Sequence, residues 1–189
     1  MRIIAPVAAV AAFTVSANLI AADTSALPQQ ARGLIKQFAT TLQGELQSAL
    51  KAGGTVEAVQ VCKERAPAIA ETLSEQSGWQ VGRTSLKTRN TALNTPDDWE
   101  RRVLKQFEAR KAAGADPKSL TYAEVVRTDG GKVYRYTQAI PTTEVCLACH
   151  GANIDPALAE TLDAAYPDDH ARGFSTGDLR GAFTLSKPM

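Results

Sequence analysis

The sequence predicts an α+β fold, with helices in its first part and most of its strands in its second. Apolar residues recur at steps of three and four over residues 28–77, which is the period of amphipathic helices. Later in the chain, two β-rich runs joined by Asp129-Gly130-Gly131 give a hairpin pattern. Helices followed by strands, with further helices between them, are typical of a single α+β domain. The 189 residues contain no internal repeat or linker that would divide the chain.

The composition excludes several classes of protein. Lys and Arg total 21 against 20 Asp and Glu, which gives a formal net charge of +1. This balance argues against a nucleic-acid binder with a general basic field, and against a polybasic membrane-surface protein. Three cysteines are too few for a disulfide scaffold. Only His150 and His170 are available for histidine chemistry.

Residues 1–22 are predicted to be a secretory signal peptide. Arg2 precedes an uncharged, Ala- and Val-rich run that ends in small residues. An uncleaved anchor is the alternative, because about 20 apolar residues can span a bilayer. Pro6 and several polar residues within the run weaken that alternative. We therefore expect residues 23–189 to be one domain in the periplasm, with no membrane contact after cleavage.

A long N-terminal amphipathic helix is expected over residues 28–52, where the apolar residues share one face and Gly53-Gly54 ends the pattern. A second amphipathic helix follows, and its apolar stripe includes Cys62. Pro67 lies inside this stripe. Because proline lacks an N–H and clashes with the preceding turn, a kink is expected near residues 63–66.

The remaining elements alternate between strands and a helix. Alternation predicts a strand over residues 79–86, and apolar spacing with acidic residues in the first turn predicts a helix over 96–111. The hairpin strands are expected at 122–128 and 132–140, and a final short strand at 179–186. Together these elements predict a mixed domain with its sheet in the second half.

The segment Cys146-Leu147-Ala148-Cys149-His150 is a C-x-x-C-H sequence, the attachment motif of a c-type haem. Two thiols at this spacing can each add to a haem vinyl group and form a thioether. The adjoining histidine then directs a ring nitrogen at the iron as an axial ligand. A redox disulfide and a zinc site are the alternatives, but a zinc site would have only Cys62 and His170 to complete it. The motif predicts one covalent haem c.

The second axial ligand has several candidates: Cys62, His170, Met189, a lysine, or none. Met189 is the terminal residue, and chain ends are poorly held. His170 follows a polar turn that favours exposure to solvent. Cys62 has no thiol partner once haem has consumed the other two cysteines, but buried inert cysteines are common. The residues alone leave open whether Cys62 is a ligand or part of the core.

Several segments together resemble a family of single-haem c-type cytochrome domains with a PAS-like fold, long catalogued as a domain of unknown function. The resemblance implies a PAS-like antiparallel sheet flanked by helices, with haem attached at Cys146 and Cys149. It also implies that His150 and Cys62 are the two axial ligands of the iron. The segments that carry it are Ala58–Cys62, Ala66–Ala70, Val81–Lys87, Arg89-Asn90, Pro96–Glu100, Cys146–Gly151, Tyr166–Asp169 and Gly177–Ala182.

Basic and aromatic residues add further candidates for the haem site. Arg83, Lys87 and Arg89 would either neutralise the two haem propionates or form a solvated face. Tyr134 and Tyr136 alternate on one strand face, so they would either line the haem pocket or belong to the core.

The leading functional hypothesis is a periplasmic haem sensor of redox state or of a small gas such as CO or NO. In this hypothesis a change at the iron alters the Cys62 bond and the surrounding fold. The alternative is a small electron-transfer cytochrome c that meets a redox partner protein. A peroxidase-like or gas-reducing enzyme is disfavoured, because only His170 could supply acid–base chemistry beside the motif. We therefore expect no enzyme activity, and a signal that passes to a separate partner.

Overall fold

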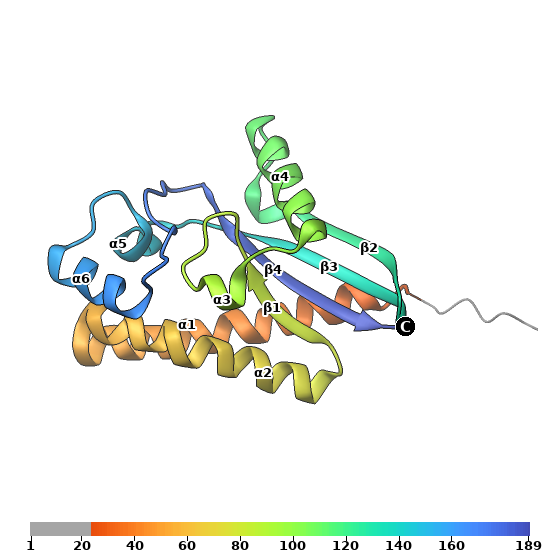
Figure 1. The fold of residues 1–189 in the computed structure, drawn as a ribbon, viewed down its shortest axis with the longest axis horizontal. Coiled ribbons are helices and arrows are strands. Elements are labelled where there is room, and N and C mark those ends of the chain that lie inside the picture. Colours follow the sequence, from red (N-terminus) through yellow and green to blue (C-terminus); the bar gives the residue numbers. More distant parts are fainter. Residues whose placement is uncertain (1–23) are drawn as a thin grey trace, which may run out of the picture.

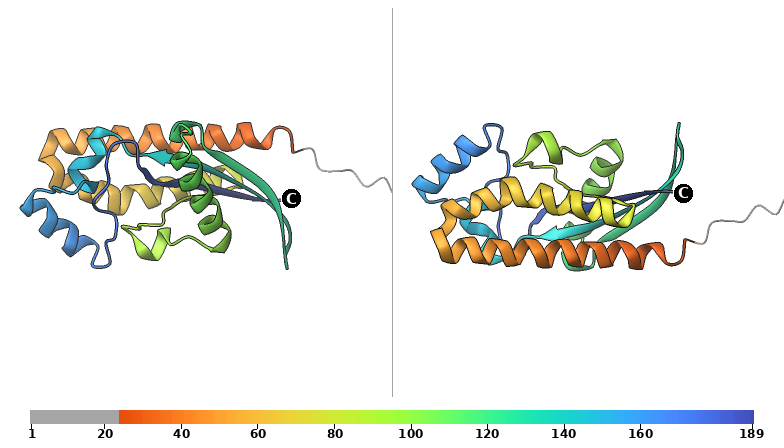
Figure 2. Two further views of the ribbon diagram at one scale, coloured as in Figure 1. Left: turned by 90° about the horizontal axis from the view of Figure 1, so that it is seen from above. Right: turned by 90° about the horizontal axis from the view of Figure 1, so that it is seen from below.

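A four-stranded antiparallel sheet with helices on both faces forms the body of the protein in a computed structural model that describes residues 24–189 (Figures 1 and 2). The predicted signal peptide, residues 1–22, lies outside the described residues. The architecture confirms the expected α+β class. The strand order is β1-β4-β3-β2, with β1 at Gln80–Thr84, β2 at Thr121–Thr128, β3 at Gly131–Pro141 and β4 at Leu179–Pro188.

The N-terminal part is a helical hairpin rather than one straight helix. Helix α1 spans Leu27–Gln60, but Gly54 inside it has φ 71° and ψ −157°. This left-handed backbone favours glycine, and the chain turns back on itself there (Figure 2). The break agrees with the helix end expected at Gly53-Gly54. Among residues 24–189, no helix is long and apolar enough to cross a bilayer.

The returning arm of the hairpin contains a π-helical segment, Val61–Arg65, before helix α2 at Ala66–Ser77. The backbone N–H of Ala66 donates to the carbonyl of Val61, five residues back. Pro67 stands at the start of α2 and has no N–H to donate. The irregularity expected near residues 63–66 is therefore a local widening of the helix, a form that often occurs at functional sites.

The two sheet faces carry separate apolar cores. Side chains alternate along β3, so that Tyr134 and Tyr136 face the α1–α2 hairpin and Ala139 faces helix α4. Helix α4, Asp98–Ala112, begins with a capping box. Tyr134 and Tyr136 are 5 % and 2 % exposed and lie in the first core. They are therefore core residues and do not line a pocket.

Short helical elements cluster around one end of the sheet. Helix α6 was not expected, although Asp155 caps it by accepting from the Ala157 and Leu158 N–H groups and Pro156 occupies its first turn. Its Leu158 packs in one cluster with Val59 of the returning hairpin arm. The bounds are Thr91–Asn94 for α3, Pro117–Ser119 for η2, Glu144–Cys146 for η3, Leu147–His150 for α5 and Pro156–Ala165 for α6.

Candidate cofactor site

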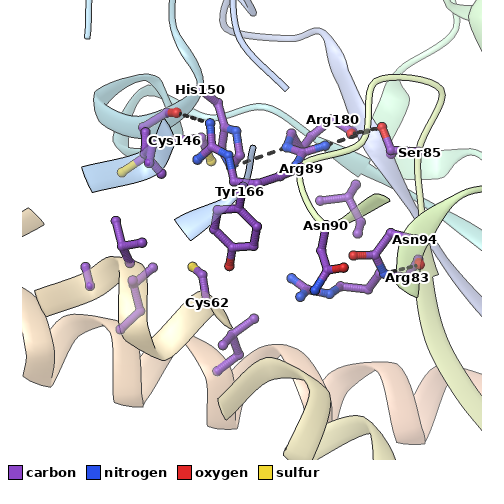
Figure 3. A pocket seen from close by; sticks show the side chains of 18 of the residues that line it. Cys62, Arg83, Ser85, Arg89, Asn90, Asn94, Cys146, His150, Tyr166 and Arg180 are labelled. Carbon is purple, nitrogen blue, oxygen red and sulfur yellow. Dashed lines mark hydrogen bonds between the residues drawn. The ribbon is translucent and has the colours of Figure 1, made fainter. Parts of the chain in front are cut away.

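A cavity of about 310 Å³ lies between the helical hairpin and the segment that carries the C-x-x-C-H motif (Figure 3). The hairpin supplies an apolar wall through side chains at helical spacing, and further apolar groups come from η3 and α6. Polar and cationic groups come from the loop after β1 and from the start of β4. The apolar lining residues are Leu42, Leu46, Leu50, Ala58, Val59, Ile140, Val145, Ala148 and Leu162.

All three reactive residues of the motif reach this cavity. Cys146, Cys149 and His150 line it, and none of the cysteines is in a disulfide. Helix α5 ends at His150, and Gly151 follows in a tight approach to the preceding turn. A Cβ at Gly151 would lie 2.6 Å from the carbonyl oxygen of Leu147, so a side chain there would displace the motif.

His150 is held in the form that a metal ligand requires. Its Nδ1 lies 2.8 Å from the Ala171 carbonyl oxygen, which can only accept, so Nδ1 carries the proton. The other nitrogen, Nε2, then carries the lone pair, which accepts from Arg180 Nε at 3.3 Å. Burial, together with Arg180 and Arg89, lowers the pKa of His150 to about 3. The imidazole is therefore neutral at physiological pH and can donate an electron pair.

Cys62 lies on the opposite wall, on the π-helical segment of the hairpin (Figure 3). Burial raises the pKa of its thiol, and Arg83 and Arg89 offset part of that rise. No other residue in the described part of the chain makes a hydrogen bond to its sulfur. The Tyr166 side chain points its hydroxyl toward Cys62 from across the cavity. Burial and Cys62 raise the pKa of Tyr166 to about 12, so the phenol keeps its proton and can donate.

One end of the cavity is cationic and lacks matching carboxylates. Arg83 and Arg180 line it, and neither has an acidic partner among residues 24–189. Burial lowers the pKa of Arg83, and burial with Arg89 and Arg83 lowers that of Arg180 to about 10. Buried charges without partners are costly, so this end is suited to a ligand that carries carboxylates.

The three basic residues singled out in the sequence have different surroundings. Arg83 lines the cavity without an acidic partner among the described residues, with its guanidinium over the Phe38 ring, whereas Arg89 lines the cavity and is paired with Asp169. Lys87 is exposed, and its Nζ donates to the Arg172 carbonyl at 2.7 Å outside the cavity. Lys87 therefore belongs to the solvated alternative.

The other candidate ligands do not reach the cavity. His170 is exposed, and its backbone N–H donates to the Thr88 carbonyl. Met189 is 43 % exposed, and its backbone N–H donates to the Lys132 carbonyl at the far end of the sheet (Figure 1). Within the described residues, no group of three His, Cys, Asp or Glu side chains is arranged to hold a metal ion. Of the candidates named from the sequence, Cys62 alone faces His150.

Sequence reasoning did not single out Tyr166, Asp169 and Arg180 as site residues, although all three contribute to the site. The Tyr166-Pro167 pair was a usable signal, because the residue before proline is held extended and ends a helix. Arg180 gave no comparable signal, since an isolated arginine in a predicted strand is ordinary.

Comparisons with known proteins agree with this architecture. A family model described as Tll0287-like matches residues 16–188. The crystal structure of the cyanobacterial haem protein Tll0287 has a similar fold, with a TM-score of 0.66 and 24 % sequence identity, over 87 % of this chain and 96 % of that one. No curated protein matches the sequence significantly.

Proposed function

The chain belongs to the Tll0287-like family, and we propose that it is a haem protein with a sensing role. In this proposal Cys146 and Cys149 hold one haem c through two thioethers, and His150 and Cys62 are the axial ligands. One observation carries the proposal. Cys62, far from the motif in sequence, lines the same cavity as the motif and faces His150 across it (Figure 3).

The charges and donor atoms of the cavity match those that haem requires. Haem is a flat apolar ring with two carboxylates on one edge, and the cavity has an apolar wall and a cationic end. The carboxylates would compensate the buried Arg83 and Arg180, which lack acidic partners among residues 24–189. The neutral Nε2 of His150 and the thiol of Cys62 are suitable donors for iron. The residues present therefore fit the group.

Bound haem would supply an iron that changes oxidation state and binds small gases. The chain's own residues set the conditions for that chemistry. His150 offers a neutral nitrogen whose orientation is fixed by Ala171. Cys62 offers a thiol that loses its proton on binding a metal, because a bound cation lowers the thiol pKa. The leucines of the hairpin give the site an apolar wall.

A sensing role is favoured over electron carriage by the surroundings of Cys62. The residue lies in a π-helical segment between the turn at Gly54 and Pro67, where the helix is irregular. An electron carrier benefits from ligands that do not move, whereas a sensor needs a ligand bond that can break and shift a helix. We propose that CO, NO or a change of redox state breaks the Cys62 bond, and that a separate partner protein detects the shift.

We propose no catalytic activity and a periplasmic location. The cavity lining contains no carboxylate and no histidine besides His150, so it lacks the acid–base group that a peroxidase-like enzyme would use. The sequence pattern of residues 1–22 and the haem attachment motif both favour export before the haem is bound.

The proposal is tested first by the attachment of haem. Haem should stay with the polypeptide through acid–acetone extraction and denaturing electrophoresis, and the mass should increase by one haem. Replacing Cys146 and Cys149 together should leave little haem attached, while Cys62→Ser should leave both thioethers intact. Release of free haem from the wild type would contradict the c-type assignment. Absorption spectra of both oxidation states, with and without CO or NO, would then separate a sensor from a carrier.

A further inference from the structure

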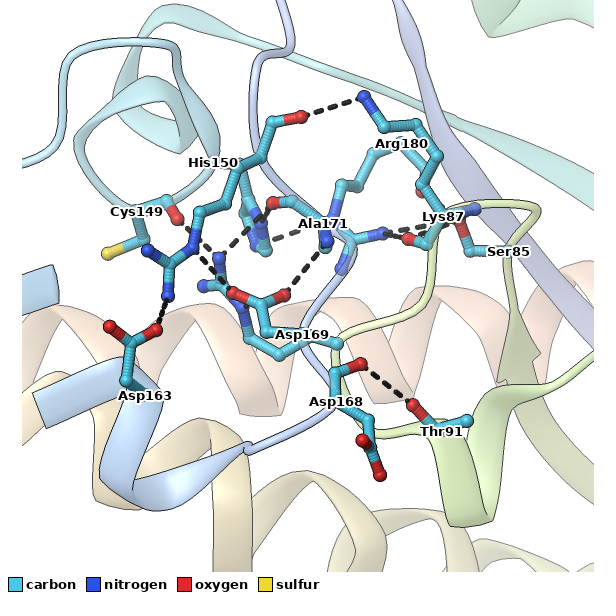
Figure 4. Close-up of polar contacts among 12 residues, drawn as sticks. Ser85, Lys87, Thr91, Cys149, His150, Asp163, Asp168, Asp169, Ala171 and Arg180 are labelled. Atoms are coloured by element: carbon cyan, nitrogen blue, oxygen red, sulfur yellow. Dashed lines mark hydrogen bonds and ion pairs between the residues drawn. The ribbon is translucent and has the colours of Figure 1, made fainter. Parts of the chain in front are cut away.

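The segment Asp168–Ala171 lies beside the loop that follows β1 and the start of α3, and two hydrogen bonds join it to them (Figure 4). The N–H of His170 donates to the carbonyl of Thr88 at 2.8 Å. The hydroxyl of Thr91 donates to the carbonyl of Asp168 at 3.0 Å. Two parts of the chain that are far apart in sequence are thus fixed next to the motif.

Asp169 is a buried carboxylate that accepts hydrogen bonds from Arg89, Arg172 and a backbone N–H. Its side chain is 2 % exposed, and that of its partner Arg89 is 9 % exposed. Oδ1 accepts from Arg89 Nε at 3.2 Å and from the Ala171 N–H at 2.8 Å, and Oδ2 accepts from Arg172 Nε at 2.9 Å. Such an arrangement is rigid, because these three N–H groups all donate to one charged carboxylate that is out of contact with water.

Arg89 extends this arrangement to both sides of His150. Its Nη2 donates to the carbonyl of Cys149 at 2.6 Å and to the carbonyl of Ala171 at 3.2 Å. The first carbonyl belongs to the residue just before His150. The second is the acceptor that lies 2.8 Å from His150 Nδ1. One guanidinium therefore fixes the backbone that carries the imidazole and also the acceptor that orients it.

We propose that Asp169 and Arg89 are positioning residues for His150, a clamp that sets how strongly its imidazole donates to iron. The inference rests on the proposed haem function. A hydrogen bond from Nδ1–H makes Nε2 a better donor, and better donation favours the oxidised metal. Arg89 shares the Ala171 carbonyl with His150, so the balance between these two donors tunes the ligand. Asp169 keeps that balance by neutralising Arg89 and holding the Ala171 N–H.

The test uses Asp169→Asn in the haem-loaded full chain. Without the carboxylate charge, Arg89 should turn more fully to the Ala171 carbonyl and weaken the bond from His150. The midpoint potential should then rise. In a Cys62→Ala background, the iron–histidine stretching frequency of the reduced protein should fall. Asp163→Asn is the matched control, because Asp163 also accepts from Arg172 but lies outside the clamp. The control should leave both the potential and the frequency unchanged.

A second variant keeps the inference testable if Asp169→Asn does not fold. Arg89→Lys keeps the positive charge but cannot reach both carbonyls and Asp169 together, so the same shifts are expected at smaller size. A potential and a frequency equal to those of the Asp163→Asn control, in protein that carries haem on His150, would overturn the clamp and leave the haem function intact. Loss of covalent haem from the wild type would instead overturn the haem function.

Discussion

The two walls of the cavity hold their proposed ligands very differently. His150 is fixed through Nδ1 to a carbonyl that a buried ion pair immobilises. Cys62 faces it from a π-helical segment, with no hydrogen bond to its sulfur among residues 24–189. The wall that carries His150 is therefore rigid at its ligand. The hairpin wall that carries Cys62 is adaptable at its ligand.

This difference indicates which metal bond would yield first. A neutral imidazole that is positioned in advance loses little entropy on binding a metal, so its bond is retained. To bind iron, the buried thiol of Cys62 must lose its proton, and the irregular helix that carries it must be held in one conformation. Both costs oppose the bond between Cys62 and iron. We therefore expect the Cys62 side to respond to the state of the iron while His150 stays bound.

The largest effect is expected for Cys62→Ala, which removes the adaptable ligand altogether. The potential should rise by roughly 0.1 V or more, within the span of about 0.8 V that axial ligands cover. The reason is that a thiolate stabilises the oxidised iron. Alanine is small and apolar, so it should cost little in packing, and both thioethers should remain. Potentiometry with optical spectra measures the change.

A wild-type spectrum and potential in Cys62→Ala would show that Cys62 is an inert core residue. The contrast between the two walls would then have no functional meaning, and electron carriage would become the better hypothesis. Cys146→Ala serves as a control, because it removes a thioether without removing either proposed axial ligand.

The second prediction concerns the rigid wall and is measured as stability. Asp169→Asn leaves Arg89 buried without its acid, so the free energy of unfolding at pH 7 should fall by about 3 kcal/mol. Burial raises the pKa of Asp169, but hydrogen bonds from Arg172, the Ala171 N–H and Arg89 outweigh that rise and hold the pKa below its ordinary value. Urea denaturation of wild type and variant measures the difference.

The sign of the pH dependence follows from that lowered pKa. Between the folded-state pKa and about 3.9, the unfolded chain binds a proton at Asp169 and the native protein does not. This contribution to stability is therefore present above pH 4 and is lost as the pH falls through the folded-state pKa. The gap between wild type and Asp169→Asn should narrow from pH 7 to pH 3. A gap that stays constant would contradict the assignment of a charged, paired Asp169.

The same contrast explains what the sequence could and could not predict. The motif and the amphipathic hairpin arise from local patterns, so Cys146, Cys149 and His150 were predicted without any tertiary information. The second arm and its irregularity near Pro67 were also local, because proline removes a specific backbone bond. Local sequence patterns therefore account for both helices of the hairpin and for the motif.

The clamp depends on contacts between distant segments and could not be predicted in this way. Arg89 Nε lies 3.2 Å from Asp169 Oδ1 in the fold, yet nothing in the sequence around either residue specifies the other. The neighbours of Cys62 could not be predicted from local sequence either, because Tyr166 reaches the cavity from the end of helix α6. That helix was itself missed, although Asp155-Pro156 is a recognisable start.

The third prediction sharpens the description of the adaptable wall. Tyr166→Phe removes the hydroxyl that points toward Cys62 and leaves the ring in place. A donor near a thiolate withdraws electron density, so its loss should lower the potential by some tens of millivolts, the equivalent of about 1 kcal/mol. Tyr134→Phe is the matched control, because Tyr134 is also buried but lies in the core that faces the hairpin. Equal potentials in the two variants would mean that Tyr166 does not interact with the sulfur.

The smallest effect is expected for Pro67→Ala, which tests whether the irregular helix matters to Cys62. Alanine restores an N–H at the start of α2, so the widened segment Val61–Arg65 can relax toward regular α-helix. Such a change would rotate Cys62 relative to α2, while the packing of Ala66 and Ile69 in the core opposes it.

The free energy of unfolding should therefore change by less than about 1 kcal/mol in Pro67→Ala. The potential should move part of the way toward that of Cys62→Ala, and CO should bind the reduced protein faster, because the ligand bond is weakened without loss of the thiol. Pro156→Ala, at the start of helix α6, controls for the loss of a proline at a helix start elsewhere. If both proline variants bind CO at the wild-type rate, the π-helical segment is only a structural response to Pro67, and the adaptability of this wall must come from the turn at Gly54.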